Sequence, residues 1–207
     1  MRKISKKGFT LVEVLVVIAI IGVLAAILVP TLVGYTLRSK VISADSTASD
    51  VRKLINNFFT EADAARYGMK LSQTAVCEGE ITVQNGTWTL TISDPTVFNH
   101  NNYISWDGSG VCASGNTEHA AGDSADDALL KKIAATLPEV EQAYIKFNLK
   151  SGSCNALYMT TETSIAVTML PFDADGWSAD NYSWDTVNQG ICTEGFIVGT
   201  SPELSFG

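Results

Sequence analysis

One carboxylate lies in a stretch of sequence that is otherwise free of charge. Glu13 is the single charged residue between Phe9 and Leu37, and most of that stretch is apolar. A charged side chain inside the hydrocarbon of a bilayer costs roughly 2.5 to 3.5 kcal/mol on insertion scales. Glu13 therefore requires either a partner that neutralises it or a position from which its carboxylate reaches interfacial water.

Four cysteines are the next residues with distinctive chemistry. Cys77, Cys112, Cys154 and Cys192 could form disulfides, and four cysteines allow three connectivities, which their spacing does not distinguish. The alternative is a four-cysteine zinc site. Structural zinc sites usually contain close C-x2-C pairs, and the wide spacings here lack them, so disulfides are favoured.

An acidic loop offers oxygen ligands for a hard cation. The segment FDADGWSADNYSWD contains Asp173, Asp175, Asp180 and Asp185 close to Gly176. Carboxylates gathered in this way can bind calcium, although their spacing is not that of an EF-hand loop and most acidic loops are only solvated. We keep Asp173, Asp175 and Asp180 as a calcium hypothesis.

The same loop is rich in aromatic residues, among them Trp177, Tyr182 and Trp184. Trp184 has a counterpart, Trp106, in the internal repeat described below, and this favours a packing role for both. Trp177 has no counterpart. It is therefore the candidate for an exposed aromatic side chain that contacts a sugar or another surface.

Neither the charge distribution nor the histidines indicate a nucleic-acid ligand or an active site. Four of the fourteen basic residues fall in the first eight positions, so ten basic residues face twenty-two acidic ones in the rest of the chain. Phosphate binding relies on clustered Lys and Arg, and no basic patch follows the leader. His100 and His119 lie in polar loops without a carboxylate or thiol constellation. We expect no enzymatic activity.

The N-terminal part of the chain, which contains Glu13, is predicted to form one long helix. The apolar run is longer than the about 20 residues that cross a bilayer, and the basic leader marks the cytoplasmic side. Beyond the run, apolar residues recur at steps of three and four, which predicts one helical stripe. The stripe consists of Val41, Ala44, Ala48, Val51, Ile55, Phe58, Ala62 and Ala65. The other faces carry Arg38, Lys40, Asp45, Asp50, Arg52, Lys53, Glu61 and Asp63, and Gly68 predicts the helix end.

Two residues should weaken this helix. Gly22 is a poor helix former, and Pro30 has no N–H and crowds the carbonyl of Ala26. The segment between them could bend or lose hydrogen bonds when its surroundings change.

The N-terminal sequence KKGFTLVEVLVVIAIIGVLAAILVP resembles the class III signal of type IV pilins and their pseudopilin relatives. A short basic leader ending in Gly8, an aromatic Phe9, Glu13 and the following apolar run carry the resemblance. It implies cleavage between Gly8 and Phe9 by a prepilin peptidase and methylation of the new Phe9 amine. Gly22 and Pro30 match the positions that flank the part of the helix that becomes extended in pilus filaments.

The resemblance also implies a partner for Glu13. The family's glutamate is thought to face the N-terminal amine of a neighbouring subunit during assembly. That amine would neutralise the carboxylate and set the axial register between subunits.

The rest of the chain contains an internal repeat. A shift of 77 positions aligns Tyr67 with Tyr144 and Cys77 with Cys154, and with small insertions NYISWDGSGVCASG aligns with NYSWDTVNQGICTEG. The predicted strands are 80–84 and 87–93, joined by an Asn85-Gly86 hairpin turn, and 156–160 and 164–170. A helix is predicted from Ser124 to Leu137, with Ser124 and Asp127 at its cap.

A helix, a small antiparallel sheet and a closing loop match the general plan of a pilin head. We therefore expect an α+β fold with a leader 1–8, a hydrophobic transmembrane and filament-core helix 9–37, a first pilin-like module 38–115, a linker 116–123 and a second module 124–207. The first module includes the amphipathic half of the long helix. The resemblance then implies one disulfide per module, Cys77 with Cys112 and Cys154 with Cys192; pairings across modules are the alternatives.

The expected function is that of a structural subunit of a type IV pilus for adhesion, motility or surface interaction. Its partners would be further copies in a helical filament, the prepilin peptidase and the pilus assembly machinery. The subunit would span the cell membrane once before assembly and lie on the bacterial surface afterwards. Two alternatives are a pseudopilin of a type II secretion or DNA-uptake system and a membrane-tethered binding module that does not polymerise. No cofactor is expected beyond the calcium or zinc ion considered above.

Overall fold

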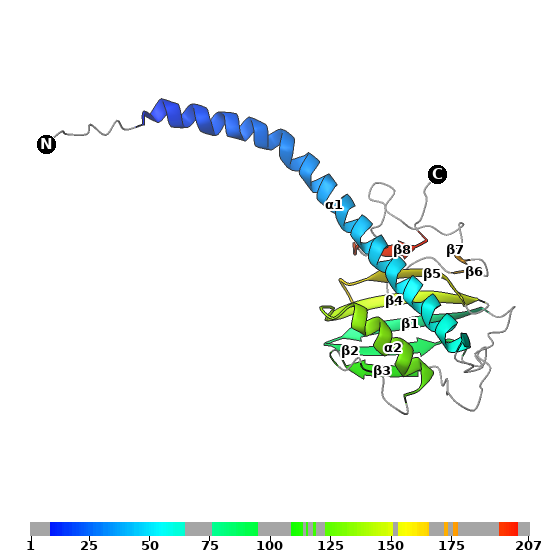
Figure 1. The fold of residues 1–207 in the computed structure, drawn as a ribbon. Helices are drawn as coiled ribbons and strands as arrows, with labels where there is room; N and C mark the ends of the chain where they lie inside the picture. The colour runs from blue at the N-terminus through cyan, green and yellow to red at the C-terminus, as the bar shows by residue number, and fades with distance from the viewer. Residues whose placement is uncertain are drawn as a thin grey trace. The chain divides into compact units, whose positions relative to one another are not determined.

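The apolar N-terminal run and the amphipathic segment that follows it form one helix, α1 (Leu11–Ala64), which Figure 1 shows together with the sheet. The computed structural model describes residues 9–64, 76–94, 109–113, 115, 118, 123–150, 153–165, 172–173, 176–177 and 195–202. The chain divides into two units, Met1–Ser39 and Lys40–Gly207. α1 contributes its first half to one unit and its second half to the other.

The first unit contains the apolar half of α1. The described side chains before Leu37 are all exposed, and the most apolar 18-residue window has a mean hydropathy of 3.1. Among the described helices, α1 alone is long and apolar enough to cross a membrane. The helix continues through Gly22 and Pro30 without a break, so a loss of hydrogen bonds between them stays a prediction. The predicted end at Gly68 lies outside the described residues.

The second unit is built on a six-stranded antiparallel sheet with the order β3-β2-β1-β4-β5-β8. Its strands are β1 (Val76–Gln84), β2 (Thr87–Ile92), β3 (Ser109–Ala113), β4 (Gln142–Lys150), β5 (Ser153–Thr160) and β8 (Gly199–Ser201). Two short strands, β6 (Phe172–Asp173) and β7 (Gly176–Trp177), pair separately. The second helix is α2 (Ala125–Thr136).

Local signals predicted the hairpin and the second helix well. Asn85 has a φ of 49° and Gly86 a φ of 72°, so both central residues of the β1–β2 turn adopt the left-handed conformation that an Asn-Gly turn provides. Ser124 caps α2, because its side chain accepts a hydrogen bond from the backbone N–H of Asp127 at 3.1 Å. Both predictions are confirmed.

The prediction of two separate small sheets is wrong. β1 belongs to the first predicted module and β4 to the second, yet they pair along their whole length, from Val76 opposite Lys150 to Gln84 opposite Gln142. β4 was not predicted, although alternating apolar residues in QAYIKFNLK indicate a strand. The predicted strand 164–170 is also not found at Ser164 and Ile165, and its remainder lies outside the described residues.

β4 is flanked by the two strands that the sequence shift of 77 residues aligns, while the repeat itself stays a prediction. β1 and β5 correspond under the shift of 77 residues, and both pair antiparallel with β4. Cys77 on β1 and Cys154 on β5 lie opposite the same residue, Leu149. β4 therefore lies between the two strands that the predicted repeat would make equivalent.

A single hydrophobic core lies between the sheet and the two helices, which both cover one face of the sheet (Figure 1). From α1 it includes Ala48, Val51 and Ile55, as the stripe predicted, together with Phe59 rather than Phe58, which is only partly buried. From α2 and the sheet it includes Leu129, Leu130, Ile133, Ile81, Trp88, Leu90, Ile145, Phe147, Leu149 and Leu157. Burying each large aliphatic side chain contributes about 1.5 to 3 kcal/mol, so this core is the main source of the head's stability.

Candidate functional site

The N-terminus of α1 holds Glu13 in a reciprocal pair of contacts with Thr10. Glu13 Oε2 accepts hydrogen bonds from the Thr10 backbone N–H at 2.8 Å and from the Thr10 hydroxyl at 2.7 Å. The backbone N–H of Glu13 donates to Thr10 Oγ1 at 3.4 Å. This is a capping box, with Thr10 as the cap and Glu13 three residues later. The contacts occupy Oε2, so Oε1 remains for a further donor.

An apolar surface of α1 follows directly after this capping box. Phe9 is 83% exposed, and large apolar side chains remain exposed as far as Tyr35. They are Leu11, Val12, Val14, Leu15, Val16, Val17, Ile18, Ile20, Ile21, Val23, Leu24, Ile27, Leu28, Val29, Leu32 and Val33. Water is a poor solvent for a surface of this kind, which must be covered by lipid or by other apolar helices.

The second half of α1 is fastened to the sheet by polar side chains as well as by its apolar stripe. Asn56 accepts from the backbone N–H of Cys154 at 2.6 Å and donates to its carbonyl at 3.4 Å. Arg52 Nε donates to the same carbonyl at 2.9 Å. Asp45 accepts from the backbone N–H of Thr200 at 2.7 Å. These side chains bind the backbone of β5 and β8 and so fix where α1 lies on the sheet.

Asp45 and Arg52 were predicted on the faces of α1 other than the apolar stripe, yet both bind the backbone of the sheet. Their polar atoms bind the carbonyl of Cys154 on β5 and the backbone N–H of Thr200 on β8. No sequence pattern marks such contacts, since they depend on which strand lies under the helix.

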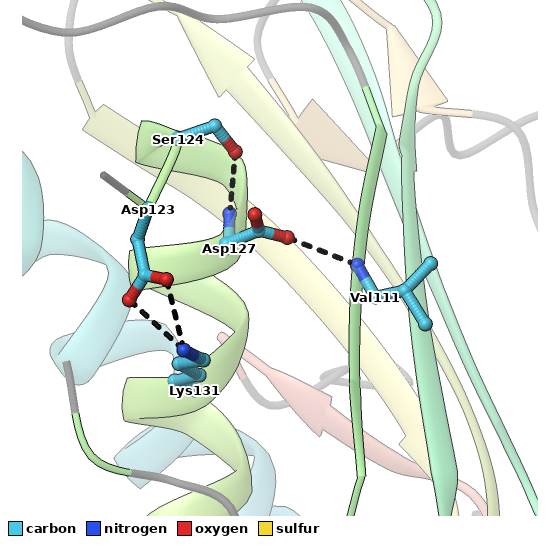
Figure 2. Close-up of polar contacts among 5 residues, drawn as sticks. All are labelled: Val111, Asp123, Ser124, Asp127 and Lys131. Carbon is cyan, nitrogen blue, oxygen red and sulfur yellow. Dashed lines mark hydrogen bonds and ion pairs between the residues drawn. The ribbon is translucent and has the colours of Figure 1, made fainter. Parts of the chain in front are cut away.

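A second polar cluster ties α2 to β3, as Figure 2 shows. Asp127 accepts from the backbone N–H of Val111 at 3.1 Å. Lys131 Nζ lies 3.0 and 2.9 Å from the two carboxylate oxygens of Asp123, and the side chains are only 10% and 12% exposed. A charged pair this deeply covered positions the first turns of α2 against the residues that precede them.

Comparison with known proteins connects the first of these features to a family. Residues 3–29 match the family model described as the prokaryotic N-terminal methylation motif. The chain is 31% identical over 99 residues to the type IV major pilin protein PilE of Neisseria gonorrhoeae, a match that covers 44% of this chain and 59% of PilE. It is 33% identical over 94 residues to the type IV major pilin protein PilA of Myxococcus xanthus, covering 38% of this chain and 41% of PilA. The chain thus spans about half the length of these two relatives.

A third relative is covered more completely. The fimbrial protein EcpC of Eikenella corrodens is 32% identical over 106 residues, and the match covers 47% of this chain and 69% of EcpC. The chain belongs to the type IV pilin family. No solved structure matches this pilin significantly.

The head of this pilin does not bring Cys77 and Cys112 together, so the predicted disulfide between them is wrong. Cys112 lies opposite Trp88, which lies opposite Val83, and Val83 is six residues along β1 from Cys77. At about 3.3 Å per residue the two cysteines are about 20 Å apart, and bridged Cα atoms are rarely more than about 7 Å apart. Cys77, Cys112 and Cys154 are buried free thiols. The predicted bond from Cys154 to Cys192 ends at a residue outside the described part of the chain.

Burial also makes these thiols unreactive. It raises the pKa of Cys77 and of Cys154 to about 12 in each case, and it raises the pKa of Cys112 as well. Since the thiolate is the nucleophile and the metal ligand, the three described cysteines behave as apolar core residues.

Most of the other predicted site residues lie outside the residues that the structure describes. Asp173 and Trp177 lie in β6 and β7, but their side chains are not described, and Asp175, Asp180 and Gly8 lie in the undescribed residues. Within the described ranges, no three His, Cys, Asp or Glu side chains gather as a metal site would require. The calcium hypothesis and the surface role of Trp177 therefore stay predictions.

Proposed function

We propose that this pilin is a structural subunit of a type IV pilus, cleaved between Gly8 and Phe9 by a prepilin peptidase and methylated on the Phe9 amine. The observation that carries the proposal is the exposed apolar surface of α1 directly behind the Thr10–Glu13 capping box. The match to the methylation motif supports the processing step. The relatives' names, type IV major pilin and fimbrial protein, favour a pilus over a pseudopilus.

Before assembly, the first half of α1 anchors the subunit in the cell membrane as a single span. A helix satisfies its own backbone hydrogen bonds, so an apolar helix of this length is stable in lipid. After extraction, the same surface packs against the equivalent helices of other copies, and the head is displayed on the bacterial surface.

Glu13 directs the addition of each subunit. Its Oε2 is held by Thr10, while Oε1 is available to accept from the cationic Phe9 amine of a neighbouring copy. The pairing removes an uncompensated charge from an apolar environment, and it does so at one axial position only. The proposal needs no cofactor and no catalytic residue.

The processing step is tested by mass spectrometry of the mature N-terminus, and the assembly step by electron microscopy of filaments sheared from cells. The proposal expects a chain that begins with methylated Phe9 and filaments that contain it. A chain that retains Met1, or surface filaments that lack this chain, would contradict it. Glu13→Ala is expected to be cleaved normally and to remain in the membrane with little filament.

A further inference from the structure

The two edge strands of the sheet meet the two helices in the same way. On β8, Gly199 lies so close to α1 that a Cβ there would be 2.1 Å from the carbonyl oxygen of Ala44. The next residue, Thr200, donates its backbone N–H to Asp45 Oδ1 at 2.7 Å. Two consecutive residues of β8, Gly199 and Thr200, therefore face two consecutive residues of α1, Ala44 and Asp45.

β3 repeats this arrangement at the other edge. A Cβ on Gly110 would be 3.0 Å from the backbone carbonyl carbon of Asp126 on α2. The next residue, Val111, donates its backbone N–H to Asp127 Oδ1 at 3.1 Å, the contact drawn in Figure 2. Thus each edge combines a glycine that admits the helix with an aspartate that binds the following N–H.

These two N–H groups are the ones that an added strand would need. β3 has β2 as its neighbour and β8 has β5, so within the described sheet each has one side without a strand. Val111 is the middle residue of β3, and Thr200 is the middle residue of β8. Unpaired N–H and C=O groups along such an edge form a template on which a strand of another chain can pair.

The edge strands lack the usual protection in their own sequences. Neither SGVCA in β3 nor GTS in β8 contains a charged residue. Val111, a residue with high β propensity, is 60% exposed on β3. Pro202 follows β8, but β3 contains no proline. Among the described residues, protection of β3 comes from α2, and the carboxylate of Asp127 supplies both a bound acceptor and a negative charge that repels an incoming carbonyl.

We propose that Asp45 and Asp127 close the two edges of the head's sheet to strands of neighbouring copies of this chain. The proposal rests on the proposed filament function, because a filament holds many heads side by side at high local concentration. Under those conditions an open edge would allow head-to-head strand pairing in place of the helix packing that sets the filament's register. The occupant that the two aspartates exclude is an edge strand of a second copy.

The test uses the purified full chain in detergent micelles, where no filament is required. The variants are Asp45→Ala, Asp127→Ala and the double variant, with Asp50→Ala as the matched control. Asp50 is also an aspartate of α1 and pairs with Lys53 on the exposed side, so its loss changes the net charge equally. The readouts are hydrogen exchange of the Val111 and Thr200 amides, light scattering and thioflavin T fluorescence.

The proposal expects about tenfold faster exchange at the amide whose aspartate is removed. It also expects concentration-dependent, thioflavin-positive association of the alanine variants, strongest for the double variant. Asp50→Ala should behave as wild type. Asp45→Asn and Asp127→Asn retain an oxygen acceptor and should associate less than the alanine variants. Alanine variants that stay dispersed with wild-type exchange overturn the proposal, and so does equal association of Asp50→Ala.

A rescue variant separates an open edge from a destabilised fold. Lysine on an edge strand prevents pairing by itself, so Val111→Lys added to Asp127→Ala should restore dispersed chains. If the chain with both Val111→Lys and Asp127→Ala associates as strongly as Asp127→Ala alone, general unfolding is the cause and the proposal fails. The micelle experiment can fail independently of the proposed function. If cells that produce the wild-type chain form no filaments, the proposed function is contradicted, but the measurements on the sheet edges are unaffected.

Discussion

Asn56 on α1 binds both backbone groups of Cys154 on β5, accepting from its N–H at 2.6 Å and donating to its carbonyl at 3.4 Å. The pairing of β5 with β4 is irregular here: Asn148 lies opposite Ala156 and Leu149 lies opposite Cys154, so Asn155 of β5 is an extra residue without an opposite partner. The amide of Asn56 thus supplies hydrogen bonds at an irregular point of the sheet. The contact joins residues that are far apart in sequence and holds the second half of α1 on the sheet.

Replacing Asn56 by alanine should destabilise the head. The backbone N–H of Cys154 would lose its partner in a buried position, and such a group costs about 1 to 3 kcal/mol. The free energy of unfolding, measured from urea titrations followed by circular dichroism, should fall by that amount. Asn57→Ala is the control, because Asn57 is the next residue of the same helix and is exposed; its effect should be below about 0.5 kcal/mol. Equal effects of the two changes would show that the contact is not important for stability.

Two adjacent lysines of α2 should differ in their contribution to stability. Lys131 pairs with Asp123 where both side chains are nearly covered, whereas Lys132 pairs with Glu61 at the surface. Lys131→Met leaves a covered carboxylate without its cation and should lower the free energy of unfolding by about 3 to 5 kcal/mol. Lys132→Met should change it by less than about 1 kcal/mol. Adding Asp123→Asn to Lys131→Met should restore part of the loss. No recovery in the double variant would argue against the ion pair as the cause.

Thr10 should contribute to assembly through Glu13. Thr10→Val removes the hydroxyl that binds the carboxylate and also accepts from the Glu13 N–H, so Glu13 is less well positioned for a neighbour's amine. We expect cleavage to continue and the yield of sheared filament to fall roughly fivefold. Thr10→Ser retains the hydroxyl and should assemble as wild type. Equal filament yields for valine and serine would remove Thr10 from the proposed mechanism.

The sheet limits how many disulfides this chain can contain. Cys77 and Cys154 lie on either side of Leu149, about 10 Å apart, and Cys112 is about 20 Å along the strands from both. No two of these three can bond, so any intramolecular disulfide must include Cys192. The denatured but unreduced chain should therefore gain at least two adducts with N-ethylmaleimide, counted by intact mass spectrometry. A chain with no reactive thiol would contradict this strand arrangement.

The raised pKa values of the buried thiols predict a loss of stability in alkali. Because burial holds the pKa of Cys77 and Cys154 at about 12, each stays protonated in the folded head while the unfolded chain ionises at about 8.5. Their contribution to stability is complete below about pH 8.5 and is lost as the pH rises toward 12. The free energy of unfolding should decline over that range, and less steeply in Cys77→Ala. An equally steep decline in that variant would assign the pH dependence to other groups, such as Tyr144 and Tyr158, whose pKa burial also raises.

Several features of this pilin follow from its sequence because the forces involved act over short distances. A stretch of about 20 predominantly apolar residues is enough to define a membrane-spanning helix, whatever the rest of the chain does. The Asn85-Gly86 pair sets its own backbone conformation, and Ser124 caps the helix that begins beside it. The step pattern of Ala48, Val51 and Ile55 identified the buried face of α1 for the same reason.

Other features were decided only by the tertiary structure, since they depend on which distant segments become neighbours. The predicted repeat suggested two sheets, but β4 pairs with β1 as well as with β5. The sequence of a strand does not specify which strands become its neighbours. That pairing separates Cys77 from Cys112 and places β5 under Asn56. The packing of the edge strands against the helices likewise places the backbone N–H groups of Thr200 and Val111 beside Asp45 and Asp127, which accept hydrogen bonds from them. Hydrophobic periodicity identifies which face of an element is buried; the backbone group that a polar side chain meets there is determined by the long-range packing of the strands.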